Sequence, residues 1–257
     1  MAEVETRGLS FHVQRMGAGD RTVVFLHGLV MDNLSSWYFT VANRAAESAD
    51  VVLYDLRGHG KTSRPKTGYS IAEMVADLDA LLDGLGVDDG KVDLVGNSFG
   101  GLLAVAYAAA HPDRVSGLAL VDGQVHDAAW GAQMKATLGL RGRDAEVEIA
   151  RSFKHWLGRH SERKRNRLAA NARALVLETS LVEDIANSPP TSDDDLRRII
   201  CPVLALYGEH SDVLHHGERL AEVLPDCRMK VYPGCTHSIL WEKTTELRDD
   251  LLEWIRR

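Results

Sequence analysis

The sequence lacks the features that mark membrane, secreted and nucleic-acid-binding proteins. No uninterrupted apolar run is long enough to span a bilayer. The first residues, Met1–Thr6, are acidic and lack the basic-then-apolar pattern of a signal peptide. The formal net charge of -7 argues against nucleic acid as a main partner, because phosphate binding favours a basic face. We therefore expect a protein that binds neither membranes nor nucleic acid.

Cysteine is also scarce. The three cysteines, Cys201, Cys227 and Cys235, are odd in number and show no paired spacing of the kind that holds a metal ion. Reduced thiols in a cytoplasmic protein fit this pattern, and we expect no bound metal. With 45% hydrophobic and 26% charged residues, the chain has the composition of a globular protein with a substantial core.

Short β-branched runs alternate with longer helical segments, which is typical of a mostly parallel sheet covered by helices. An early, half-exposed antiparallel strand is predicted over Leu9–Arg15. Buried strands are predicted over Thr22–Leu26, Val51–Tyr54, Lys91–Val95, Val115–Val121, Val203–Tyr207 and Arg228–Tyr232. Helices are predicted over Trp37–Glu47, Phe99–Ala110 and Glu242–Ile255, and a further helix is opened by a capping box at Ser70–Glu73.

Strand-like runs are missing from about Gly123 to Ser188, where several amphipathic helices are predicted instead. Such a block, placed between two strands, is expected to form a cap over one end of the sheet. We predict a core of residues 1–122 and 196–257, with a helical cap of residues 123–195 inserted after the sixth strand. Ligands of such sheets bind outside the carboxyl ends of the strands, so the cap would shape the pocket.

The strongest motif is Gly96-Asn97-Ser98-Phe99-Gly100, which lies between an apolar strand and an Ala-rich helix. That context is the one expected of a nucleophile elbow, a strained turn that holds a serine hydroxyl clear of the backbone. The flanking glycines fit because neighbouring chain must pass close to them. Ser98 is therefore the candidate nucleophile.

A serine hydroxyl needs a base to take its proton, and the base needs an acid to orient it. Chain order in this kind of site is serine, acid, histidine, and His237 follows the last predicted strand. Asp212, shortly after the strand over Val203–Tyr207, is the preferred acid. Glu209, nearer that strand, and Asp122, at the end of the preceding strand, are its competitors.

Two backbone N–H groups are expected to stabilise the oxyanion of a tetrahedral intermediate. Phe99 N–H lies at the start of the helix after Ser98, where the helix dipole also favours negative charge. The loop after the strand ending at Leu26 supplies the second donor, which we assign to Leu29 N–H. The side chain of His27 is interpreted as a buried brace of that loop.

These motifs, together with His27-Gly28 and Asp55-Leu56-Arg57-Gly58-His59-Gly60, resemble the α/β-hydrolase superfamily over nearly the whole chain. The resemblance implies an α/β-hydrolase fold with a variable lid, a Ser-His-Asp triad, no metal or organic cofactor, and a two-step acyl-enzyme mechanism. It also implies a small-molecule substrate as the partner, with a homodimer left open. The fold alone does not establish activity.

Ser98, where dehalogenases and epoxide hydrolases carry Asp, favours hydrolysis of a carboxylic ester or thioester. Asn97 and the run 235–242 also resemble hydrolases that cleave carbon–carbon bonds of vinylogous diketones, although Leu29–Asn33 departs from their Gly-rich oxyanion loop. A binding protein that closes on a ligand without turnover is a third reading. Within the cap, Trp130, Met134 and Trp156 are candidates for lining an apolar substrate pocket.

Overall fold

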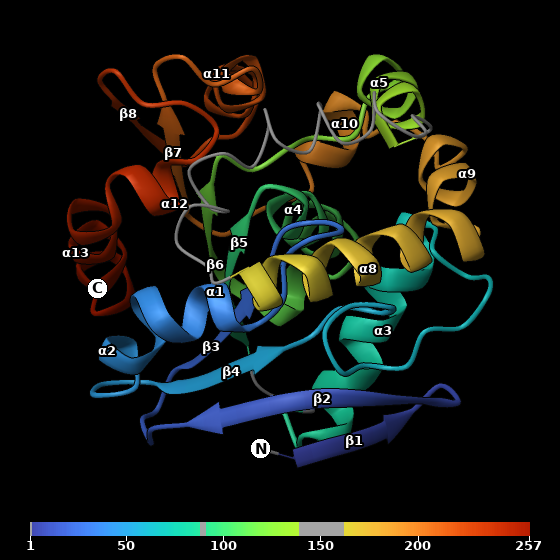
Figure 1. Cartoon of the computed structure of the whole chain (residues 1–257). Helices are drawn as coiled ribbons and strands as arrows, with labels where there is room; N and C mark the ends of the chain where they lie inside the picture. Colours follow the sequence, from blue (N-terminus) through green and yellow to red (C-terminus); the bar gives the residue numbers. More distant parts are fainter. Residues whose placement is uncertain (1, 88–90, 139–161) are drawn as a thin grey trace.

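The computed structural model describes residues 2–87, 91–138 and 162–257. In these ranges one eight-stranded sheet has the order β1-β2-β4-β3-β5-β6-β7-β8 (Figure 1). β2 pairs antiparallel with both β1 and β4, and every later pairing is parallel. The strands are β1 Ala2–Thr6, β2 Leu9–Met16, β3 Thr22–Leu26, β4 Asp50–Tyr54, β5 Val92–Asn97, β6 Val115–Val121, β7 Val203–Gly208 and β8 Cys227–Tyr232.

Helices cover both faces of the sheet, and the alternation of side chains along each strand feeds two separate cores. On β3, Val24 and Leu26 join the core under α3 (Ile71–Gly84), α4 (Phe99–Ala110) and α11 (Leu214–Val223). Val23 and Phe25 join the core on the opposite face. That second core lies under α1 (Ser35–Trp37), η1 (Tyr38–Ala42), α2 (Asn43–Ala45), α12 (Ile239–Glu242) and α13 (Thr244–Ile255). The fold class expected from the sequence is thus confirmed.

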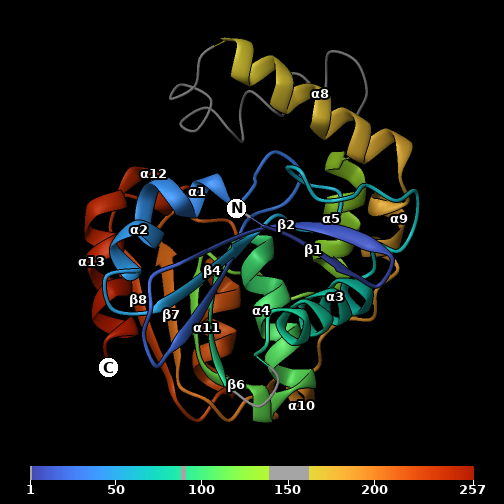
Figure 2. The ribbon, with the colours of Figure 1, turned by 90° about the horizontal axis from the view of Figure 1, so that it is seen from below.

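Between β6 and β7 the described chain is helical, with α5 (Ala128–Leu138), α8 (Glu162–Glu178), α9 (Leu181–Ala186) and α10 (Asp193–Leu196). Figure 2 shows α8 as an outlying helix along one side of the molecule. Leu168 and Ala172 of α8 pack on Met31, which lies in the loop after β3. The insertion therefore covers the carboxyl end of that central strand. The boundaries 123 and 195 of the cap stay a prediction.

Three local features differ from the prediction. β1 was not expected, and it pairs with β2 through a tight turn in which Arg7 and Gly8 have φ of 51° and 72°. Two successive left-handed residues match the twist of a hairpin, so Arg7-Gly8 was the signal for this edge strand. The helix over Trp37–Glu47 is split around η1, and the last helix is divided before Thr244.

Ser70 caps α3 as expected, because its hydroxyl accepts from Glu73 N–H at 3.2 Å. The side chain of Glu73 does not complete the capping box and binds Arg7 at 2.8 Å instead. In the part of the chain that the structure covers, no helix is both long and apolar enough to cross a membrane.

Candidate active site

Ser98 occupies the sharp turn between β5 and α4, with φ 54° and ψ -117°. A non-glycine residue in this region is strained, and such strain is common where a side chain must be presented to a ligand. The glycines around it are required by close packing. A Cβ on Gly96 would lie 2.4 Å from Gly100 O, and one on Gly100 would lie 2.2 Å from Leu26 O. These contacts give the sequence motif its physical reason.

His237 lies in the loop between β8 and α12, and its Nε2 is 2.9 Å from Ser98 Oγ. The two residues are 139 positions apart in sequence, so the sheet brings them together. The loop is fixed on several sides. His210 N–H donates to Cys235 O at 2.7 Å, and the carboxylate of Glu242 accepts from Thr236 N–H at 2.8 Å. The imidazole of His237 is therefore held within hydrogen-bond reach of the hydroxyl.

Gly208, the last residue of β7, explains how the histidine loop comes so close to the sheet. A Cβ there would lie 2.3 Å from Thr236 O and 2.7 Å from Cys235 O. Any side chain at this position would push the loop that carries His237 outward. The end of β7 thus sets the position of His237 as well as the start of the loop that carries Asp212.

Two carboxylates lie near His237, and they differ greatly in environment. Asp212 Oδ1 is 3.9 Å from His237 Nδ1, and the Asp212 side chain is 69% exposed. That separation is longer than a hydrogen bond. Among the described residues, His237 Nδ1 has no hydrogen-bond partner. Asp212 thus lies close to His237 without a hydrogen bond to it, and its role as the acid stays a prediction.

Asp122 is fully buried at the end of β6 and has φ of 44°. Its Oδ1 accepts from Gly208 N–H at 3.2 Å, while its Oδ2 has no partner in the described parts of the chain. Burial raises the pKa of Asp122 to about 6, and the nearby charge of His237 acts in the opposite direction. The structure therefore brings this second carboxylate to the same histidine. Glu209 differs, because its Oε2 accepts from Gly234 N–H at 2.7 Å.

Two buried histidines brace the loop after β3. His27 Nδ1 donates to Gly28 O at 2.7 Å, and its Nε2 accepts from Leu56 N–H at 3.0 Å. These contacts agree with the bracing role expected of His27. His59 Nδ1 donates to Arg57 O at 2.9 Å, and its Nε2 accepts from Val30 N–H at 2.8 Å. Burial, followed by the nearby His27, lowers the pKa of His59 to about 3, so His59 is neutral and keeps Nε2 as an acceptor.

The role of His59 was missed from the sequence, although the run Asp55–Gly60 had been singled out. Its partner Val30 has φ of 66°, which is rare for a β-branched residue. The unusual turn fixes the peptide planes of the loop. Asp32 makes a further contact with the loop, since its Oδ2 accepts from Gly28 N–H at 2.9 Å. An Asp four residues after the glycine was the only sequence signal for this second brace.

The two predicted oxyanion donors are available in this arrangement. Val30 N–H and Gly28 N–H are occupied by His59 and Asp32. Within the described ranges, neither Leu29 N–H nor Phe99 N–H donates to a protein acceptor. Both groups flank the site, one after β3 and one directly after Ser98. The assignment of these two N–H groups as the oxyanion hole stays a prediction.

The three cap residues predicted to line a substrate pocket differ in their surroundings. The ring of Trp130 stacks on Phe99, with centroids 6.2 Å apart and an angle of 16° between the planes. Met134 is half-buried and packs against the core under α4. Trp156 lies outside the described residues. Trp130 is thus in contact with a residue of the elbow.

Within residues 2–87, 91–138 and 162–257, one group of side chains has ligand atoms close enough for a metal ion. Asp127, His215 and His216 place one such atom each within 4.8 Å of one another. His216 Nδ1, however, accepts from Val125 N–H at 3.2 Å. A neutral ring then carries its proton on Nε2, which faces Asp127 Oδ2 at 3.4 Å. We therefore interpret His216 as a brace of the chain that follows β6, held by the hydrogen bond from Val125.

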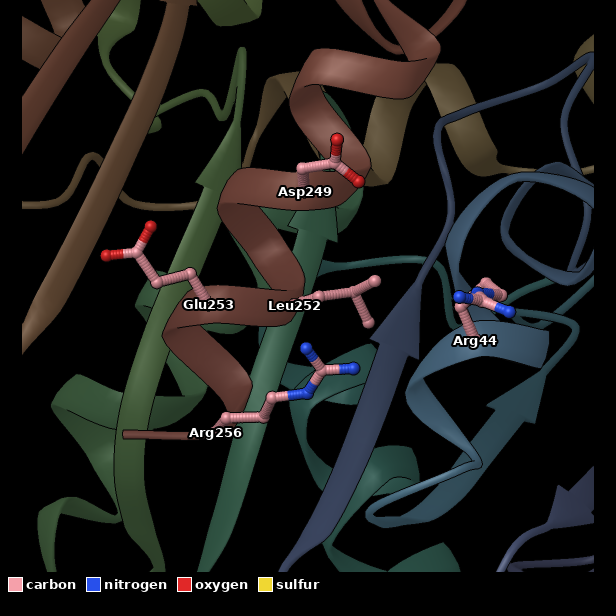
Figure 3. A pocket seen from close by; sticks show the side chains of 5 residues that line it. All are labelled: Arg44, Asp249, Leu252, Glu253 and Arg256. Atoms are coloured by element: carbon pink, nitrogen blue, oxygen red, sulfur yellow. The ribbon is translucent and has the colours of Figure 1, made fainter.

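A surface hollow is lined by Arg44 of α2 and by Asp249, Leu252, Glu253 and Arg256 of α13 (Figure 3). The side chains around it are mostly charged and belong to helices on the face that carries the second core. It contains none of the predicted catalytic residues. The Ser98–His237 pair at the carboxyl end of the sheet is therefore the candidate active site.

The chain belongs to the α/β hydrolase fold family, whose sequence model matches residues 21–244. A 2-hydroxy-6-oxo-2,4-heptadienoate hydrolase of Pseudomonas putida is 29% identical over 255 residues, which cover 92% of this chain and 89% of that protein. A 2-hydroxy-6-oxononadienedioate/2-hydroxy-6-oxononatrienedioate hydrolase of Paraburkholderia phymatum is 30% identical, covering 96% and 91%. The structure of an esterase from Rhodococcus sp. ECU1013 superposes with a TM-score of 0.77 at 26% identity, covering 99% and 97%.

Proposed function

We propose that this hydrolase cleaves a carboxylic ester or thioester of a small organic substrate, with Ser98 as nucleophile and His237 as base. The single observation that carries the proposal is the 2.9 Å contact between Ser98 Oγ and His237 Nε2. A strained elbow serine in contact with an imidazole is the arrangement that activates a hydroxyl for attack on an acyl carbon.

The reaction proceeds in two steps. Ser98 Oγ attacks the acyl carbon while His237 Nε2 takes the hydroxyl proton. The carbonyl electron pair moves to oxygen, where hydrogen bonds from Leu29 N–H and Phe99 N–H stabilise the negative charge. As the carbonyl reforms, His237 gives the proton to the departing alkoxide or thiolate. Water, activated by the same histidine, then releases the acid and restores the Ser98 hydroxyl.

Asp212 is proposed as the acid that holds His237 in the required tautomer. A modest inward movement of its exposed loop would close the 3.9 Å separation from His237 Nδ1. Asp122 is the competitor, since it is buried and carries an oxygen without a partner among the described residues. The nearby His237 also lowers the pKa of Asp122, against the effect of burial. Single Asp→Asn variants separate the two, as described in the Discussion.

Carbon–carbon bond hydrolysis is the second candidate. The two full-length relatives described above are named for 2-hydroxy-6-oxo acid substrates, and such molecules are vinylogous diketones. Asn97, beside the nucleophile, is also compatible with this reaction. The loop Leu29–Asn33 lacks the glycines expected there, and for that reason ester hydrolysis is preferred.

The experiment is a substrate panel for wild type and Ser98→Ala. The panel holds p-nitrophenyl esters of increasing chain length, acyl thioesters and a vinylogous diketone. We expect turnover of an ester or thioester that Ser98→Ala abolishes. Faster cleavage of the diketone would favour the second candidate. Tight binding of panel members without turnover of any would favour a binding protein and overturn the proposal.

A further inference from the structure

Three buried side chains on the chain that follows β6 each carry a polar atom without a partner. Gln124, His126 and Trp130 are 7%, 2% and 4% exposed. Gln124 Oε1, His126 Nδ1 and Trp130 Nε1 have no hydrogen-bond partner in the described ranges. Leaving a buried polar atom unpaired is costly, and such atoms in native proteins are normally satisfied by protein, water or ligand.

All three residues belong to one set of contacts that reaches the turn carrying the nucleophile. Gln124 N–H donates to Ser98 O at 3.3 Å. Trp130 stacks on Phe99, whose N–H is a proposed oxyanion donor. The ring of His126 packs edge to face on Trp130, with centroids 5.3 Å apart. These contacts connect the three residues to the elbow.

The donor and acceptor types follow from the contacts. His126 Nε2 is 2.8 Å from Ser188 O, and a carbonyl can only accept, so Nε2 carries the proton. The other nitrogen of the neutral ring, Nδ1, is then an acceptor. Gln124 Oε1 is a second acceptor, and Trp130 Nε1–H is a donor.

We propose that Gln124, His126 and Trp130 form a polar subsite that binds an uncharged hydroxyl group on the acyl part of the substrate. A hydroxyl can donate to an acceptor of this set and accept from the indole N–H at the same time. A carboxylate would face two acceptors, and an ammonium group would find no charged partner among these three side chains. The proposal rests on the proposed function, because it assigns part of the substrate to the acyl side of Ser98.

The test compares a p-nitrophenyl hydroxyalkanoate series, with the hydroxyl moved along the chain, with the unsubstituted esters. Wild type is expected to prefer one hydroxylated ester. The preference is measured as the ratio of kcat/KM for that ester to kcat/KM for the unsubstituted ester. Trp130→Phe keeps an aromatic ring on Phe99 but removes the N–H, and Gln124→Met keeps the length but removes the amide. Each variant is expected to lower the ratio roughly fivefold. Gln133→Met, on the exposed side of α5, is the matched control and should keep the wild-type ratio.

The number of competent sites is counted by labelling with a serine-directed fluorophosphonate, so that a misfolded variant is not mistaken for a selective one. If wild type labels and hydrolyses esters but shows no preference for any hydroxylated ester, the subsite is wrong and the proposed function stands. If the ratio is unchanged in Trp130→Phe and Gln124→Met, the polar atoms hold water only and the proposal is overturned. If wild type neither labels nor turns over, the proposed function itself fails.

Discussion

Val30 donates its backbone N–H to Nε2 of His59 across 2.8 Å, and this bond holds a β-branched residue at φ 66°. The two residues lie in loops after different strands, β3 and β4. The bond occupies the Val30 N–H in the loop after β3. The neighbouring Leu29 N–H has no such bond to a described residue and is the predicted oxyanion donor. A buried, neutral histidine thus acts as a positioning residue for the predicted oxyanion hole.

His59→Phe should lower kcat with little change in KM, because the Leu29 N–H would lose its orientation toward the transition state. Removal of one oxyanion donor typically costs roughly a hundredfold or more in rate, and this variant should approach that loss. Steady-state kinetics on the best ester of the panel give the measurement. His111→Asn, at the far end of α4, is the control. A rise in KM at constant kcat would contradict a positioning role.

Asp212→Asn should reduce turnover by roughly a hundredfold or more while the fold is kept, because the amide stabilises the wrong tautomer of His237. Glu209→Gln keeps an oxygen for Gly234 N–H and should stay near wild type, which makes it the matched control. Turnover numbers and circular dichroism spectra of both variants are compared. Near-normal turnover in Asp212→Asn, together with collapse in Asp122→Asn, would transfer the acid role to Asp122.

The raised pKa of Asp122 predicts a pH dependence of stability. The folded protein holds this proton more tightly than the unfolded chain, so the group favours folding most at acidic pH. That contribution is lost as pH rises from about 3.8, the ordinary value, through about 6. Relative to Asp122→Asn, wild type should lose roughly 3 kcal/mol of unfolding free energy over this window. Urea unfolding of both proteins at a series of pH values measures it, and parallel curves would contradict the raised pKa.

Gly101→Ala should destabilise the protein even though alanine is the better helix former. A Cβ on Gly101 would lie 2.6 Å from Gly123 Cα, a backbone atom that has no room to retreat. Overpacking of this kind costs roughly 1–3 kcal/mol. Gly84→Ala is the matched control, since its Cβ would meet only the side chain of Val4 at 3.1 Å. Thermal unfolding of both variants gives the comparison, and equal midpoints would refute the close approach.

The parts of the fold that could be predicted from the sequence are those that depend on local sequence patterns. β3 and β6 are short, mostly apolar runs, and their observed bounds match the predicted ones. The elbow likewise follows from glycines at fixed offsets from Ser98. β1 escaped prediction because its alternation is short and largely exposed. Its only strong signal was the Arg7-Gly8 turn.

Features that depend on contacts between distant segments could not be predicted as well from the sequence. The choice between Asp212 and Asp122 turns on burial and on which oxygen faces His237, and neither is encoded in spacing. Val30 in a left-handed conformation could not be expected, because isolated β-branched residues avoid it. Its backbone N–H donates to His59, a contact between distant segments that accompanies this conformation. The unpartnered atoms of Gln124 and Trp130 likewise emerge only once the chain after β6 is folded against the elbow.

The most direct test of the account is the rate at which a fluorophosphonate labels Ser98, with the modified peptide located by mass spectrometry. Wild type should be labelled rapidly on the peptide that contains Ser98, His237→Ala at least a hundredfold more slowly, and Ser98→Ala not at all. Labelling of His237→Ala at the wild-type rate would contradict the claim that this imidazole takes the proton from the Ser98 hydroxyl.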